Sequence, residues 1–119
     1  MDMNTTMNMP VLALRGLTIF PGCILSFDVE REISVRALER AMERDQYIFL
    51  VAQRELGTLQ PGEKDLYSIG TVSVIRQILR LGETSVRVMM EGKGRAKLRR
   101  LWQTEPYLQG NVEPIREMK

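Results

Sequence analysis

The segment from Tyr67 to Gly92 constrains the fold of this 119-residue chain more than any other part of the sequence. It contains two runs rich in apolar residues, separated by Leu81-Gly82-Glu83-Thr84. Gly82 can adopt the positive φ that the first central residue of a type II′ turn requires, so a two-residue hairpin loop is predicted. This loop would place Leu79 opposite Val86 in an antiparallel pair of strands.

The predicted register sorts the hairpin side chains onto two faces, because successive residues of a strand point to opposite sides. The first face is apolar and core-like: Ile75, Leu79, Leu81, Val86, Val88 and Met90. The second face combines two apolar side chains with arginines: Ile78, Met89, Arg76, Arg80 and Arg87. Such a patch suits exposed apolar segments of another polypeptide, since methionine adapts to varied ligands. The alternative is that another strand or the N-terminal segment covers Ile78 and Met89, or that they are singly exposed.

The apolar phase of the first hairpin strand changes near its middle. Val72 and Val74 have the parity opposite to that of Ile75. A β-bulge or a strong bend would explain the change, and it would let one long strand serve two sheets.

Hydrophobic periodicity and turn residues predict the remaining elements. Strands are expected over residues 10–16, 25–30 and 47–52, and the last should be buried on both faces because it is continuously apolar. One amphipathic helix is expected over residues 31–44. One helix among about six strands indicates a mainly β (α+β) fold in which antiparallel sheets curl or close on themselves.

Composition excludes several classes of catalytic site. The chain has no histidine, so it has no Ser-His or Cys-His nucleophile pair and no His-containing zinc site. Its one cysteine, Cys23, excludes an internal disulfide and is expected to be buried and inert in its apolar context. With 44% hydrophobic residues, a net charge of +2 and no apolar run of membrane-spanning length, we expect one soluble domain.

Two basic motifs favour structural interpretations over anion binding. Residues 91–95, Glu-Gly-Lys-Gly-Arg, lack the Walker pattern and are predicted to form a turn between two strands. Arg95, Lys97, Arg99 and Arg100 form a basic ridge, for which nucleic-acid binding is the functional interpretation. We favour a solvated outer face, because Trp102 and Tyr107 are not interleaved with the ridge as stacking platforms would be.

Several strings together resemble one family. PVLALRG (residues 10–16) followed by IFPG (19–22) is similar to the opening of the Lon protease amino-terminal domain. The string VEREISVRALERAMERD (29–45) and then IFLVAQ (48–53) continue the match. Three later strings fall in the family's order and spacing: DLYSIGTV (65–72), QILRL (77–81) and MEGKGRA (90–96).

The resemblance implies a PUA-like pseudo-barrel with one helix. It divides the chain into a flexible lead-in over residues 1–9, a single Lon amino-terminal domain over 10–116, and the start of a connector over 117–119. In the family, an ATPase module and a peptidase module with a Ser-Lys dyad follow, so catalysis, ATP and Mg are implied only for those absent modules. No catalytic residue, cofactor or metal site is therefore expected in this chain, and its expected location is cytoplasmic.

The implied role is substrate recognition for ATP-dependent proteolysis and protein quality control. The expected partners are unfolded or damaged proteins and, in a parent hexamer, copies of this domain; neither a membrane nor nucleic acid is expected. Candidate polypeptide-binding residues fall in two places. The first is the hairpin patch defined above, and the second is the apolar stretch before the Pro-Gly turn: Leu17, Ile19, Phe20 and Pro21. The alternatives are a nucleic-acid-binding PUA-like module that uses the basic ridge, and a stand-alone adaptor domain.

Overall fold

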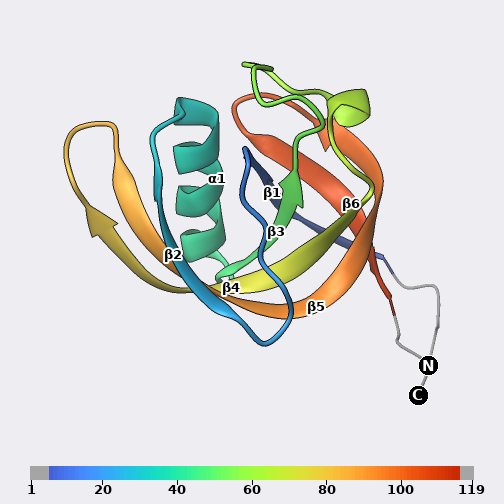
Figure 1. Ribbon diagram of the computed structural model, residues 1–119, viewed down its shortest axis with the longest axis horizontal. Helices are drawn as coiled ribbons and strands as arrows, with labels where there is room; N and C mark the ends of the chain where they lie inside the picture. Colours follow the sequence, from blue (N-terminus) through green and yellow to red (C-terminus); the bar gives the residue numbers. More distant parts are fainter. Residues whose placement is uncertain (1–5, 116–119) are drawn as a thin grey trace.

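The computed structural model describes residues 6–115, which form a mainly β domain with one helix (Figure 1). The elements in chain order are β1 (Met7–Leu14), β2 (Ile24–Val29), α1 (Glu32–Glu43), β3 (Tyr47–Ala52), the 3₁₀ turn η1 (Glu63–Asp65), β4 (Ile69–Arg80), β5 (Val86–Gln103) and β6 (Leu108–Pro114). The predicted fold class is confirmed. Residues 1–5 and 116–119 lie outside the described part, and with them most of the expected lead-in and the expected connector.

The six strands form one sheet in the order β2-β5-β4-β3-β1-β6. The sheet closes because β5 is long enough to pair twice. Its first part pairs with β4 and β2, and its second part, from Ala96 to Gln103, pairs with β6. Strands β1, β3, β4, β5 and β6 therefore make a closed barrel, and β2 is added beside the hairpin end of β5. All pairs are antiparallel except β1 with β3.

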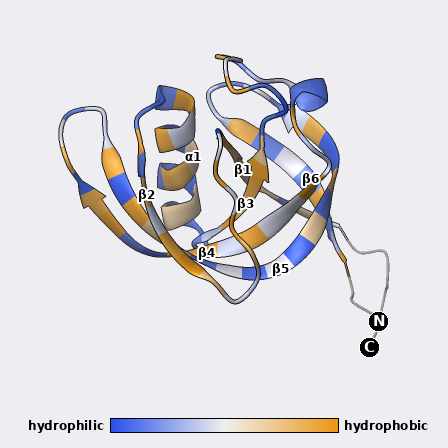
Figure 2. Ribbon diagram, in the orientation of Figure 1, coloured by the Kyte–Doolittle hydropathy of each residue, from blue (hydrophilic) through white to orange (hydrophobic). Residues whose placement is uncertain are grey.

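Two buried clusters stabilise the fold, and they occupy opposite faces of β1 and β3. Val11 and Phe49 belong to a cluster lined by the barrel strands, whereas Leu12 and Leu50 belong to a cluster that includes helix α1. Residues 48–51 are all buried, as the continuously apolar run predicted, and β3 is coloured hydrophobic along its length in Figure 2. The helix packs mainly on β1 through Ala37, Leu38 and Ala41.

The hairpin register prediction is wrong by one residue at the tip. The Leu81 N–H donates to the Ser85 carbonyl at 2.9 Å, so the loop has three residues and not two. Gly82 is not among the described glycines with positive φ. Ile75 still pairs with Met90 as predicted, because a bulge between Ile75 and Gln77 absorbs the difference. Beyond that bulge the side chains of β4 change face relative to the prediction, whereas Val86 and Val88 of β5 stay on the core face.

Strand β4 has the predicted change of phase near its middle. Register shifts occur between Val72 and Ser73 and between Ile75 and Gln77, on both sides of the predicted position. Val72 accordingly lies in the barrel cluster and Ile75 in the helix cluster. One strand thus contributes to both cores.

Two local predictions are corrected. Residues 91–95 form no turn, because β5 runs through them without interruption and only bulges where Lys93 is extra. The first strand begins before residue 10, since Met7, Asn8 and Met9 pair with β6 and Met9 is buried. The expected lead-in is therefore shorter than nine residues.

Candidate polypeptide-binding surface

The segment from Arg15 to Cys23 connects β1 to β2 (Figure 1). Gly16 and Gly22 have positive φ, and they mark its two bends. The segment is held at its centre by Ile19, whose carbonyl accepts a 2.9 Å hydrogen bond from the buried Thr71 hydroxyl. At its end, the Gly22 N–H donates to the carbonyl of Gly92 at 2.9 Å. The predicted Pro-Gly turn is confirmed, with the Cys23 N–H donating to the Phe20 carbonyl.

The structure separates the four predicted residues of this segment by exposure. Ile19 is only 3% exposed and anchors the segment, so it is unavailable to a ligand. Phe20 is 51% exposed, Pro21 is exposed and Leu17 is half-buried. The apolar stretch therefore consists of one buried anchor, with Leu17 before it and Phe20 and Pro21 after it accessible.

Residues from β4 and the loop before it extend this apolar region. A pocket of about 290 Å³ is lined by Leu17, Ile19, Tyr67, Ile69 and Arg95, among others. Tyr67 and Ile69 are 46% and 41% exposed. The Arg95 guanidinium lies 5.7 Å from the centre of the Phe20 ring, which is within the range of a cation–π contact.

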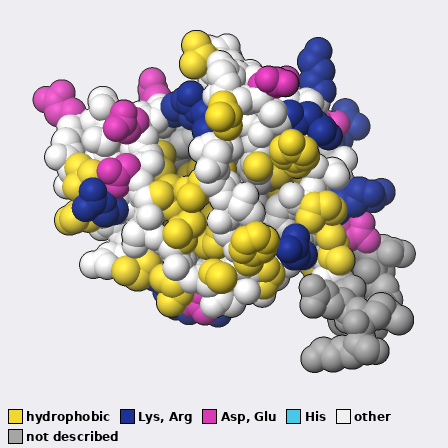
Figure 3. Space-filling model, in the orientation of Figure 1, with side chains coloured by type: hydrophobic (Ala, Val, Ile, Leu, Met, Phe, Trp, Pro, Cys, Tyr) yellow, Lys and Arg dark blue, Asp and Glu magenta, His cyan; other side chains and the backbone are white. Residues whose placement is uncertain are grey.

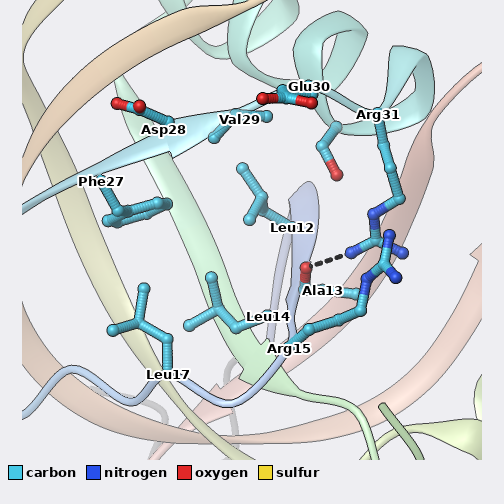
Figure 4. Close-up of a pocket in the computed structure, with 11 residues that line it drawn as sticks. Leu12, Ala13, Leu14, Arg15, Leu17, Phe27, Asp28, Val29, Glu30 and Arg31 are labelled. Atoms are coloured by element: carbon cyan, nitrogen blue, oxygen red, sulfur yellow. Dashed lines mark hydrogen bonds between the residues drawn. The ribbon is translucent and has the colours of Figure 1, made fainter. Parts of the chain in front are cut away.

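A second pocket of about 250 Å³ lies on the other side of Leu17, and both pockets are also lined by Leu14. Its apolar wall comes from β1, β2 and the connecting segment, as the labelled side chains of Figure 4 show: Leu12, Leu14, Leu17, Phe27 and Val29. We call the accessible apolar side chains around the two pockets the Leu17 surface: Leu17, Phe20, Phe27, Tyr67 and Ile69. Figure 3 shows hydrophobic side chains gathered on this face of the molecule.

Arginines lie around the Leu17 surface. Arg54 lies 4.8 Å from the centre of the Tyr67 ring. Arg31, between β2 and α1, donates to the Ala13 carbonyl and to the Gln53 side chain, both at 2.7 Å. The pKa of Arg31 is lowered from its ordinary value, first by burial and second by the positive charge of Arg15.

The hairpin patch does not exist as one surface. Ile78 pairs with Val88 and packs against the helix cluster, whereas Met89 pairs with Ser26 and Gln77 on the opposite face. The predicted register placed Ile78 and Met89 together, and the three-residue loop separates them.

The arginines of the hairpin patch are exposed, and each lies beside a carboxylate. Arg87 donates to Asp28 at 2.8 Å, and Arg80 lies 3.7 Å from Glu39. Arg76 pairs with Glu91. Hydrogen bonding to Arg87 lowers the pKa of Asp28. These arginines are parts of surface ion pairs, and they do not form a common rim.

The basic ridge has the predicted alternation, with Ala96 and Leu98 buried and Lys97 and Arg99 exposed. Arg99 lies 3.5 Å from Glu113. Cys23 is exposed, in contrast to the prediction, because it lies just after the turn that leaves the core.

Sequence reasoning missed Tyr67, Ile69 and the pairing of Arg15 with Arg31. Tyr67 lies just before the strongly apolar strand β4 and Ile69 begins it, so their exposure has no signal in the local pattern. Arg15 and Arg31 follow β1 and β2, two strands that do not pair with each other, so only the folded chain brings the two arginines together. Within residues 6–115, no helix combines the length and apolar character that a membrane crossing requires.

Comparison with known proteins identifies the family. The model of the ATP-dependent protease La (LON) substrate-binding domain matches residues 8–119. The Lon protease of Clostridioides difficile (strain 630) is 41% identical over 107 residues, which are 90% of this chain and 14% of that protein. Lon protease 1 of Bacillus subtilis (strain 168) is 38% identical over 110 residues, which are 92% of this chain and 14% of that protein. The chain thus spans about one seventh of the length of these relatives.

Solved structures share the fold. The N-terminal domain of a Mycobacterium avium complex Lon protease has a TM-score of 0.76 at 17% identity, covering 95% of this chain and 57% of that one. A Lon N-terminal domain protein from Xanthomonas campestris has a TM-score of 0.69 at 13% identity, covering 95% of this chain and 62% of that one. With the barrel, its added β2 strand and the family match in agreement, the chain belongs to the family of Lon protease substrate-binding domains.

Proposed function

We propose that this domain captures unfolded or degron-bearing polypeptides for an ATP-dependent Lon-type protease, and that it does so at the Leu17 surface. The single observation that carries the location is the cluster of accessible apolar side chains around the two pockets that share Leu17. Folded proteins bury such side chains, so a surface that offers them selects for polypeptides whose own apolar residues are exposed.

The chemistry of the surface suits weak and general capture. The aromatic rings of Phe20 and Tyr67 offer apolar area without a demanding geometry, and arginines lie over both rings. The two pockets are small, about 250 and 290 Å³, so each contact contributes little. We propose that a parent hexamer compensates by presenting several copies of the domain at high effective concentration. ATP hydrolysis and peptide cleavage belong, in this proposal, to modules outside this chain.

The nucleic-acid alternative has less support. Two of the four cations of the basic ridge are engaged within the domain, since Arg95 lies over Phe20 and Arg99 lies beside Glu113. A ridge that tracked a phosphate backbone would need its cations free. We therefore favour the polypeptide.

The test is binding of a fluorescent, permanently unfolded polypeptide, such as reduced and carboxymethylated lactalbumin, measured by anisotropy. Phe20→Ser and Tyr67→Ser each remove an accessible ring and are expected to weaken binding about three- to tenfold, as loss of one contact residue typically does. Leu79→Ser is the matched control, because Leu79 is 55% exposed on the hairpin and away from the surface. Equal weakening by all three variants, or none by the first two, would contradict the proposed location.

A further inference from the structure

The side chains of Arg15 and Arg31 lie against each other at one end of the Leu17 surface. Arg15 follows β1 and Arg31 precedes α1, and Figure 4 shows their two guanidinium groups side by side. Two positive charges side by side repel each other unless an anion lies between or beside them. Hydrogen bonds to the Ala13 carbonyl and the Gln53 side chain nevertheless hold Arg31 in place, and Arg15 is exposed beside it.

No carboxylate neutralises this pair within residues 6–115. Neither Arg15 nor Arg31 lies within ion-pair distance of a described acidic group, and the two hydrogen bonds of Arg31 go to the neutral Ala13 carbonyl and Gln53 amide. The acidic residues that line the neighbouring space are Asp28, Glu30, Glu32 and Glu105, and Asp28 is paired with Arg87 at 2.8 Å. Of these, Glu32 is already bonded to Arg36 at 2.7 Å. N–H donors of two guanidinium groups therefore remain available for an external oxyanion.

The surroundings of the pair indicate which oxyanion fits. Both arginines line the 250 Å³ pocket, whose other walls include Leu14, Leu17 and Phe27. They also line a larger open pocket of about 760 Å³, below the loop at Leu59–Gly62. An inorganic anion would use the charge and leave the apolar wall empty. A carboxylate attached to an apolar side chain would use both.

We propose that Arg15 and Arg31 bind the terminal carboxylate of a polypeptide that ends in an apolar residue. The guanidinium forks match the two carboxylate oxygens, the last side chain occupies the smaller pocket, and the preceding residues follow the Leu17 surface. This inference rests on the proposed function and specifies its substrate class as free carboxyl ends.

The experiment compares two forms of one fluorescent octapeptide that ends in Phe-Leu: the free acid and the C-terminal amide. Binding is measured with the wild-type domain and with Arg15→Gln, which removes a charge but no described hydrogen bond. Arg44→Gln is the control, because Arg44 is an exposed arginine at the other end of α1. Sodium phosphate, at constant ionic strength, is the competing inorganic oxyanion.

We expect the wild-type domain and Arg44→Gln to prefer the acid about tenfold, the factor that one net charge-assisted hydrogen bond supplies. Arg15→Gln should reduce this preference to about twofold or less and leave the affinity for the amide unchanged. Equal binding of acid and amide by the wild-type domain would overturn the carboxylate inference and leave the proposed function standing. Displacement of the acid by phosphate at equal molar affinity would overturn the assignment to carboxyl ends. Failure of both peptides and of the unfolded polypeptide to bind would overturn the proposed function and the inference together.

Discussion

The carbonyl oxygen of Phe20 lies directly against Gly92, so that a Cβ added to Gly92 would be only 2.4 Å from that oxygen. This contact attaches the connecting segment to β5, and it determines where Phe20 stands on the Leu17 surface. The glycine is required by close packing of two backbones, since its φ is not positive.

Gly92→Ala should therefore destabilise the domain by about 2–3 kcal/mol, because neither backbone can move away without losing hydrogen bonds. Gly94→Ala is the matched control in the same strand, since an added Cβ there meets nothing within 4 Å. Urea denaturation measures both. Equal and small effects would show that the segment is not held against β5 as described.

Substitutions at the neighbouring residues Ile19 and Phe20 should have different effects, the first on the stability of the domain and the second on binding of unfolded polypeptide. Ile19→Ala empties a buried site and is expected to cost about 2–4 kcal/mol in the free energy of unfolding. Phe20→Ala removes a half-exposed ring, so it should change stability by less than about 1 kcal/mol while weakening capture of unfolded polypeptide. Thermal denaturation and anisotropy report the two effects. A larger loss of stability in Phe20→Ala than in Ile19→Ala would contradict the anchoring role of Ile19.

The ion pair of Asp28 with Arg87 predicts a dependence of stability on pH. The hydrogen bond from Arg87 lowers the pKa of Asp28 below its ordinary value of 3.8. Because the folded pKa is the lower one, the stabilisation is present above pH 3.8 and is lost as the pH falls from that value through the folded pKa. Asp28→Asn should flatten this part of the curve of stability against pH. Glu91→Gln should act in the same direction, since Arg76 lowers the pKa of Glu91.

Salt provides the control for that prediction, because both pairs are at the surface and are screened. The difference between wild-type and Asp28→Asn stability should shrink in 1 M NaCl, where the screening length is about 3 Å. If the stability of the wild-type and Asp28→Asn proteins falls identically with decreasing pH at low salt, the prediction is contradicted.

Gln53 connects the start of α1 to the loop that follows β3. Its buried amide accepts from Arg31 at 2.7 Å and donates to the carbonyls of Glu55 and Thr58, both at 3.0 Å. Gln53→Ala should cost about 1–3 kcal/mol, because buried partners lose their hydrogen bonds. Hydrogen exchange should also become faster in residues 54–60. Gln60→Ala, at an exposed site in the same loop, should leave both measurements unchanged.

Most of the architecture could be predicted from sequence because it depends on local patterns. The helix, the doubly buried β3, the Pro-Gly turn and the change of phase in β4 all follow from periodicity and turn residues. The closure of the barrel by β5 could not be predicted, since nothing in residues 91–95 distinguishes a bulge from a turn. The two glycines there suggested a turn, yet Gly92 is needed where Phe20 approaches.

The candidate site was predicted only in part, and the reason is the hairpin loop. One additional loop residue moves Ile78 to the core face and leaves Leu79 exposed. The hairpin patch, which was inferred from the alternation of side chains along the strand, is therefore not formed. The prediction for the segment at Leu17–Pro21 depended on no strand register, and the structure buries only Ile19 of its four predicted residues. Tyr67, Ile69 and the Arg15–Arg31 pair depend on contacts between distant segments, which a single sequence does not reveal.

Backbone amide chemical-shift mapping with an unfolded polypeptide tests the central claim most directly. Titration with reduced and carboxymethylated lactalbumin should shift amides at residues 15–20 and 67–69, around the Leu17 surface. Amides at the hairpin tip, residues 79–85, should stay in place. Shifts confined to the hairpin tip or to the basic ridge at residues 95–100, with residues 15–20 unmoved, would contradict the account.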